Sequence, residues 1–201
     1  KGHACAALYA ILADKGYFPL EELETFNQEG SRLEGHPNIK IPGVVATTGS
    51  LGHGLGIACG LALADRSSNI YVLLGDGECN EGSIWEAAML AGGKKISNLC
   101  VIIDFNKWQA TDRSQDVMAL DPLADKWKAF GWNTIEVDGH NIDQLLEAFG
   151  QFPAENGKPT AIIAHTVKGK GVSFMEDDNN WHYRIPNAEE VERSKIELGI
   201  K

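Results

Sequence analysis

Residues 70–108 constrain the fold more than any other part of the chain. Two short apolar runs rich in strand-forming residues, 70–74 and 99–103, flank a segment, 80–90, whose apolar residues recur at helical spacing. Continuous apolar runs of this length are typical of parallel strands that are buried on both faces. The stretch therefore predicts a strand–helix–strand unit within a parallel sheet.

A polar residue follows each predicted strand. Asp76 lies between two glycines, Gly75 and Gly77, which allow a ligand to approach the main chain closely, and Asn106 comes 30 residues later. A strand–helix–strand crossover needs about 30 residues to return to the same sheet edge. We therefore expect Asp76 and Asn106 to lie side by side, at the edge where open α/β sheets bind ligands. Their oxygens suit Mg²⁺ when phosphate completes its coordination. The alternative is a helix cap and an ordinary turn residue.

Length and composition fit one globular domain. The chain has 201 residues, of which 43% are hydrophobic and 23% charged. No apolar stretch is long enough to span a membrane, and no secretory signal is visible. The net charge of −10 argues against a nucleic-acid partner.

The four cysteines lack metal-ligand spacing. We expect most of them to be buried small hydrophobes of a protein in the reducing cytoplasm. Cys79, beside the glycine-flanked Asp76, is either a packing residue or a reactive thiol.

The remaining patterns alternate between helix and strand. A long loop, 29–45, has no predicted regular structure, which is typical of functional or disordered segments. This alternation predicts an α/β fold, a three-layer sandwich with a mostly parallel sheet. Beyond the central unit, the predicted helices are 1–15, 20–26, 55–64, 122–130, 141–149 and 187–198, and the predicted strands are 134–137 and 159–165.

Gly-Asp-Gly followed by Asn at this spacing resembles the thiamine diphosphate-binding motif. The longer sequence Gly75-Asp-Gly-Glu-Cys-Asn-Glu-Gly-Ser-Ile-Trp-Glu-Ala-Ala is similar to the transketolase family, especially its split-subunit members, and the resemblance runs over nearly the whole chain. It implies that residues 1–201 form the domain that binds the cofactor diphosphate. It also implies Mg²⁺, or another divalent cation such as Ca²⁺ or Mn²⁺, held by Asp76, Asn106 and the backbone carbonyl of Trp108.

The resemblance also assigns contacts with thiamine diphosphate. It places His3, Lys168 and His182 against the diphosphate side of the cofactor, and Glu81 in a network that joins two cofactor sites at a subunit interface. From the residues alone, Lys168 belongs to a solvated basic loop or a phosphate clamp, and Glu81 is an acid that complements a helix dipole. The implied cofactor-binding residues are His3, Gly49, Ser50, Leu51, Asp76, Gly77, Glu81, Asn106, Lys168 and His182.

Three histidines are implied in catalysis. By resemblance, His36 and His182 act at substrate oxygens, and His3 lies against the reactive ring of the cofactor. Without the resemblance, the sequence around His36 would be interpreted as an exposed loop. Tyr183 stands where the family usually has glycine, so it either narrows the substrate channel or points away. His53 stands where members often have glutamine, and we assign it no role.

The implied reaction transfers a two-carbon ketol group from a ketose phosphate to an aldose phosphate. The family's separate pyrimidine-binding domain, which activates the cofactor, has no counterpart in this sequence. We therefore expect a second polypeptide, as an α₂β₂ assembly, or a longer natural chain; an N-terminal segment is expected before Lys1. The alternatives are activities like those of deoxyxylulose phosphate synthase, dihydroxyacetone synthase or sulfosugar transketolase, and a non-catalytic regulatory subunit.

Overall fold

A parallel sheet forms the centre of the protein, whose computed structural model describes residues 1–200. Its strands are β1 (Ile70–Gly75), β2 (Leu99–Phe105), β3 (Asn133–Asp138) and β4 (Thr160–His165), in the order β1-β2-β4-β3. All neighbouring pairs are parallel, and Gly75 lies opposite Asp104 in the register of β1 and β2. Asp76 and Asn106 therefore follow the same end of adjacent strands, as the crossover spacing predicts.

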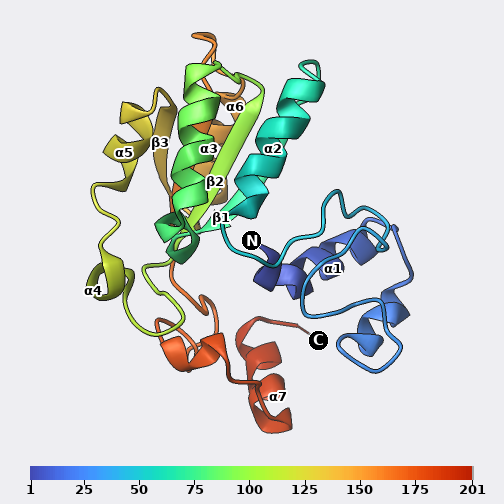
Figure 1. Cartoon of the computed structure of the whole chain (residues 1–201). Helices are drawn as coiled ribbons and strands as arrows, with labels where there is room; N and C mark the ends of the chain where they lie inside the picture. The colour runs from blue at the N-terminus through green and yellow to red at the C-terminus, as the bar shows by residue number, and fades with distance from the viewer. Residues whose placement is uncertain (201) are drawn as a thin grey trace.

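Helices cover both faces of the sheet and confirm the three-layer α/β fold (Figure 1). On one face, α2 (His53–Ala64), α3 (Gly82–Gly93) and α5 (Leu123–Ala129) enclose the largest apolar core. On the other face, α6 (Ile142–Gly150) packs over a smaller core. Asn141 caps α6 by accepting a hydrogen bond from the Gln144 N–H, as its position predicts.

The N-terminal segment forms a small lobe beside the carboxyl ends of the strands (Figure 1). It contains α1 (Cys5–Asp14) and the long loop, which has neither helix nor strand, as expected. The loop is nevertheless well anchored, because Leu33 and Ile41 are buried against α1 and the Tyr9 hydroxyl donates to the Glu34 carbonyl at 2.9 Å. The remaining helices are the 3-10 turns Gly2–Ala4, Leu20–Thr25, Gly77–Asn80 and Asn179–His182, together with α4 (Ser114–Met118) and α7 (Ala188–Glu197).

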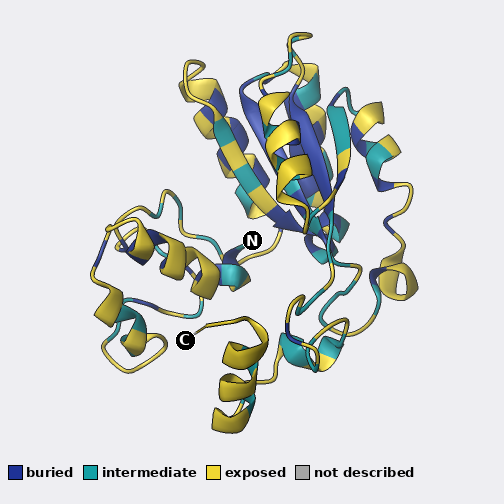
Figure 2. Cartoon of the chain, turned by 180° about the vertical axis from the view of Figure 1, so that it is seen from behind, coloured by how far each residue is buried: buried dark blue, intermediate teal, exposed yellow. Residues whose placement is uncertain are grey.

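Two expectations need correction, and one short helix was not expected. The helix predicted over 80–90 starts later, because Gly77–Asn80 forms a 3-10 turn and α3 begins at Gly82. β1 is not buried on both faces: it lies at the sheet edge, where Tyr71 and Leu73 are 52% and 45% exposed. Figure 2 shows the buried central strands between helices whose outer faces are exposed. The sequence patterns also do not predict the short helix α4.

The cysteines are all buried, in agreement with their apolar surroundings. Burial raises the pKa of the Cys79 thiol, which opposes formation of a reactive thiolate and favours its interpretation as a packing residue. Within residues 1–200, no helix is both long enough and apolar enough to cross a membrane.

Candidate functional site

A cavity of about 1170 Å³ opens at the carboxyl ends of the strands, where the N-terminal lobe and the segment after β4 meet the sheet. Most of the residues predicted for the site line it, although they come from distant parts of the sequence. These are His3, His36, Gly49, Leu51, Asp76, Gly77, Asn106, Trp108, Lys168 and His182. Two predicted residues, Ser50 and Glu81, are exposed and do not line this cavity.

Asp76 is held at the wall of the cavity with 2% of its surface exposed. One carboxylate oxygen accepts the Gly77 N–H at 2.8 Å, and the other accepts the Lys107 N–H at 2.8 Å and the Ser114 hydroxyl at 2.9 Å. Burial nevertheless raises the pKa of Asp76, because desolvation outweighs these three donors. A cation beside the carboxylate would stabilise its ionised form.

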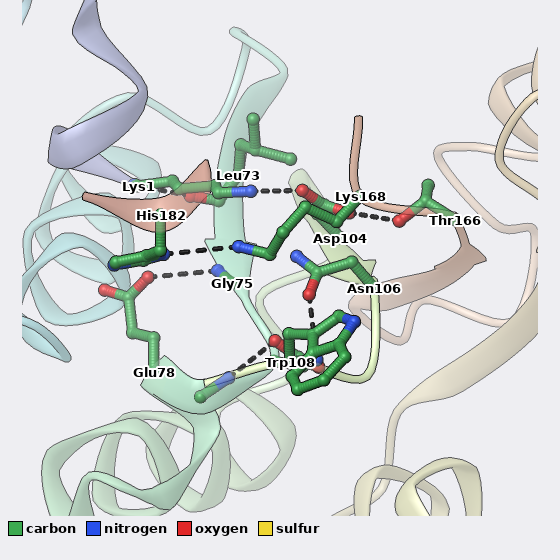
Figure 3. Close-up of polar contacts among 12 residues, drawn as sticks. Lys1, Leu73, Gly75, Glu78, Asp104, Asn106, Trp108, Thr166, Lys168 and His182 are labelled. Carbon is green, nitrogen blue, oxygen red and sulfur yellow. Dashed lines mark hydrogen bonds and ion pairs between the residues drawn. The ribbon is translucent and has the colours of Figure 1, made fainter. Parts of the chain in front are cut away.

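Asn106 and Trp108 complete an oxygen-rich corner of the cavity. The Asn106 side-chain oxygen accepts the Trp108 N–H at 2.9 Å (Figure 3). Within the described part of the chain, no cluster of three or more histidine, cysteine or acidic side chains could hold a metal. A cation here would therefore use one carboxylate, one amide oxygen and a backbone carbonyl. These residues fit Mg²⁺ bound together with a phosphate ligand.

Lys168 and two histidines line another part of the cavity. The Lys168 Nζ atom lies 3.2 Å from His182 Nδ1 (Figure 3). The ring centroids of His182 and His3 are 5.9 Å apart. Partial burial, followed by the charge of Lys1, lowers the pKa of His3 to about 4, and partial burial followed by the charge of Lys168 lowers the pKa of His182. Both rings are therefore neutral at pH 7, with one donor and one acceptor nitrogen each. Burial also lowers the pKa of Lys168, so an anion such as a diphosphate would stabilise its charge.

The glycine-rich turn before α2 brings the His36 loop to the cavity. A Cβ atom placed on Gly49 would lie 3.5 Å from the His36 ring, so the loop packs directly against this turn. His36 is exposed there and lines the cavity together with Gly49 and Leu51. His53, to which we assign no role, is exposed at the start of α2.

Glu78, which no sequence pattern singles out, lines the cavity and is only 4% exposed. Its two carboxylate oxygens accept the N–H groups of Gly52, at 2.9 Å, and Gly75, at 3.2 Å. It therefore joins the start of α2 to the end of β1. The sequence pattern alone indicates that the acidic residues after Asp76 are a solvated helix start. The 3-10 turn that buries Glu78 has no signature in the apolar spacing.

Asp104 was also missed, although the sequence contains a signal for it. Asp104 is the second-last residue of β2 and comes two residues before Asn106, so it lies close to the strand end at which open α/β sheets bind ligands. Asp104 accepts the Thr166 hydroxyl at 2.5 Å and pairs with the Lys1 side chain. Burial alone would raise the pKa of Asp104, but Lys1 and these hydrogen bonds hold it below its ordinary value.

Comparison with known proteins agrees with this geometry. Residues 1–201 match the family described as transketolase, thiamine diphosphate binding domain. The chain is 43% identical over 202 residues to one of the apulose-4-phosphate transketolase subunits, from Phocaeicola vulgatus, covering 98% of this chain and 72% of the relative. It is 49% identical over 181 residues to a 6-deoxy-6-sulfo-D-fructose transketolase subunit of a Clostridium species, covering 88% of this chain and 66% of the relative.

Longer transketolases match as well. Human transketolase is 43% identical over 187 residues, covering 90% of this chain and 30% of the human protein. The solved structure of Campylobacter jejuni transketolase superposes with a TM-score of 0.94 at 32% identity, covering 100% of this chain and 33% of that chain. The present chain therefore spans about a third of these proteins, and about two thirds to three quarters of the relatives named as subunits.

Proposed function

The chain belongs to the transketolase family, and from its thiamine diphosphate-binding domain we propose that it is the cofactor-binding part of a transketolase completed by a second polypeptide. The proposed reaction is the reversible transfer of a two-carbon ketol group from a ketose phosphate to an aldose phosphate. One observation carries the proposal: the oxygen corner of Asp76, Asn106 and Trp108 shares a cavity with Lys168 and His182. Such a cavity offers a divalent cation and a diphosphate complementary partners.

In this proposal, Asp76, Asn106 and the Trp108 carbonyl hold Mg²⁺, or Ca²⁺ or Mn²⁺ in its place. Lys168, His3 and His182 donate to the diphosphate, and the glycines of the cavity wall allow close approach of the cofactor. Thiamine diphosphate supplies the electron sink needed to break and form the carbon–carbon bond. The further cofactor-binding residues that we propose within this cavity are His3, Gly49, Leu51, Gly77 and His182. Ser50 and Glu81 lie outside the cavity of the free chain, so their proposed contacts with the cofactor would depend on the site as completed by the partner.

The histidines are proposed to handle protons at substrate oxygens. His3 and His182 are neutral at pH 7 because the pKa of both is lowered, so each has one nitrogen that can accept a proton and one N–H that can donate a hydrogen bond. His36 approaches the cavity from the N-terminal lobe, beside Gly49. From there it can stabilise charge that develops on a carbonyl or hydroxyl oxygen of the sugar.

An exposed apolar surface supports the need for a partner. The helix α2 contains no Asp, Glu, Lys or Arg from His53 to Ala64, yet its Ile57 and Leu61 are each 39% exposed. The neighbouring helix α3 exposes Met89 and Leu90. Contiguous exposed apolar side chains mark interaction surfaces. We propose that a partner chain carrying the pyrimidine-binding domain covers this surface in an α₂β₂ assembly in the cytoplasm, with exposed Glu81 near the interface.

A sulfosugar is a second candidate donor. Its supporting observation is the 49% identity to a subunit named for 6-deoxy-6-sulfo-D-fructose, against 43% to one named for apulose 4-phosphate. A sulfonate and a phosphate are both tetrahedral anions, so discrimination between them would depend on the site as completed by the partner.

A donor panel tests the proposal. The full chain, purified with its partner subunit, is incubated with thiamine diphosphate, Mg²⁺, an aldose phosphate and one ketose at a time: a ketose phosphate, apulose 4-phosphate or the sulfosugar. We expect products two carbons longer than the acceptor, and their loss in the Asp76→Ala variant. Cofactor binding without transfer from any donor would instead identify a non-catalytic subunit.

A further inference from the structure

The loop that follows β2 folds back onto Asp76. Trp108 and Arg113 form an antiparallel bridge, and the Ser114 N–H donates to the Lys107 carbonyl at 3.0 Å. Both ends of this hairpin reach the same carboxylate oxygen of Asp76, through the Lys107 N–H and the Ser114 hydroxyl. The position of Trp108, whose carbonyl is a proposed metal ligand, therefore depends on how this hairpin is held.

Three side chains hold the hairpin in place. The Arg113 guanidinium carbon lies 3.7 Å from the centroid of the Trp108 ring. The two terminal nitrogens of Arg113 donate to the two carboxylate oxygens of Asp177 at 2.7 and 2.6 Å. The Trp108 indole N–H also donates to Asp177, at 2.8 Å. Each of the three side chains thus contacts the other two, and we call this set the Trp108 clamp.

The clamp connects the hairpin to the segment that carries the proposed diphosphate-binding lysine. Asp177 has a left-handed backbone, with φ at +56°, and its N–H donates to the Lys168 carbonyl at 2.8 Å. A second link runs beside it, because the Asn179 amide donates to the Ala110 carbonyl at 3.2 Å. The Lys168 side chain in turn lies against His182. One side of the clamp therefore fixes Trp108, and the other fixes Lys168.

We propose that the Trp108 clamp positions the proposed metal ligands relative to Lys168. One Mg²⁺–diphosphate unit could then contact the metal ligands and Lys168 at the same time. This inference rests on the proposed function and adds positioning residues to it. The side chains of Arg113 and Asp177 are 36% and 51% exposed, and exposed ion pairs add little to folding stability. A bidentate, ring-stacked arginine, however, imposes a defined geometry. The clamp should therefore affect ligand binding more than stability.

The test measures cooperation between Mg²⁺ and inorganic pyrophosphate on the full chain. The Mg²⁺ affinity of the chain is determined with and without pyrophosphate. The ratio of the affinity with pyrophosphate to the affinity without it reports how well the metal ligands and Lys168 bind one Mg²⁺–pyrophosphate unit together. We expect this ratio to fall at least ~10-fold in Asp177→Asn and to fall less in Arg113→Lys, which keeps the charge but loses the planar fork. The urea unfolding midpoint should not change.

A matched control lies in the N-terminal lobe. Arg32 and Glu22 form another bidentate pair, with bonds of 2.5 and 2.8 Å, and Arg32 lies over the Phe18 ring, but none of these residues lines the cavity. Glu22→Gln should leave the ratio unchanged. An unchanged ratio in Asp177→Asn, or an equal fall in Glu22→Gln, would overturn the clamp.

Hydrogen exchange separates failure of the clamp from failure of the proposed function. In the free chain, Asp177→Asn should speed exchange of the Lys107 and Ser114 amides, which the hairpin protects, and Glu22→Gln should not. If the wild-type chain shows no cooperation between Mg²⁺ and pyrophosphate, either alone or with its partner chain, the proposed function fails. If exchange in Asp177→Asn also equals that of the wild type, the clamp fails as well.

Discussion

Gly52 lies where the glycine-rich turn enters α2, and replacing it with alanine should be strongly destabilising. Its φ is +86°, a left-handed conformation that residues with a side chain adopt at a cost. An added Cβ would lie 2.3 Å from the Ser83 hydroxyl and 2.9 Å from the Glu81 Cβ. The same residue donates its N–H to Glu78, so a shift would also disturb the link between α2 and β1. Gly52→Ala therefore combines backbone strain with overpacking.

The expected loss of unfolding free energy follows from these two effects. Left-handed strain costs about 1–2 kcal/mol, and overpacking in a well-packed site costs about 1–3 kcal/mol. Together they predict a loss of about 2–5 kcal/mol. Ser83→Ala in the Gly52→Ala background removes the closest atom and should restore about 1 kcal/mol or more. The strain and the contact with Glu81 would remain.

Urea unfolding followed by far-ultraviolet circular dichroism measures these changes. Gly56→Ala is the matched control, because Gly56 lies in the helix that Gly52 precedes and its Cβ would meet no atom within 4 Å. Alanine favours a helix over glycine, so the control should gain about 0.5–1 kcal/mol. A Gly52→Ala variant within about 0.5 kcal/mol of the wild type, the range of ordinary surface substitutions, would refute this reasoning. Failure of Ser83→Ala to restore any stability would refute the overpacking part.

Three further predictions concern packing, pH and metal removal. Gly92→Ala should lose about 3 kcal/mol in the same urea assay, because its Cβ would lie 1.8 Å from the Phe130 carbonyl oxygen; wild-type stability would contradict this. The His3 pKa of about 4 lies below its ordinary 6.5, so the unfolded chain binds more protons between these values. The unfolding free energy should therefore fall as pH is lowered from 6.5 to 4, and it should fall less steeply in His3→Asn than in the wild type. Equal slopes of unfolding free energy against pH in the two proteins would exclude the effect. EDTA should release thiamine diphosphate from the wild-type chain, as seen by equilibrium dialysis, and retention would show that binding does not need a metal at Asp76.

The strands and the pairing of Asp76 with Asn106 could be predicted because simple rules connect them to the sequence. Apolar runs indicate buried strands, and the crossover length brings the ends of two strands together. The placement of Lys168, His36 and His182 in the same cavity had a different source, namely resemblance to a family. No periodicity in the sequence indicates that these loops reach the strand ends.

Other features depend on packing between distant segments and could not be predicted. The sequence predicts a β1 that is buried on both faces, but an apolar run does not indicate a position at the edge of the sheet. The burial of Glu78 follows from a 3-10 turn that places its carboxylate under two glycine N–H groups. The bond from Trp108 to Asp177 joins residues 69 positions apart, and only the paths of two loops bring them together.

Calorimetric titration of the full chain with thiamine diphosphate tests the central claim most directly. It would be done with and without Mg²⁺, with and without the partner chain, and repeated with Asp76→Ala. We predict binding that requires the metal, strengthens with the partner and disappears in the variant. Binding that is independent of Mg²⁺, or equal in Asp76→Ala, would contradict the metal corner, and no binding in any mixture would contradict the proposed function.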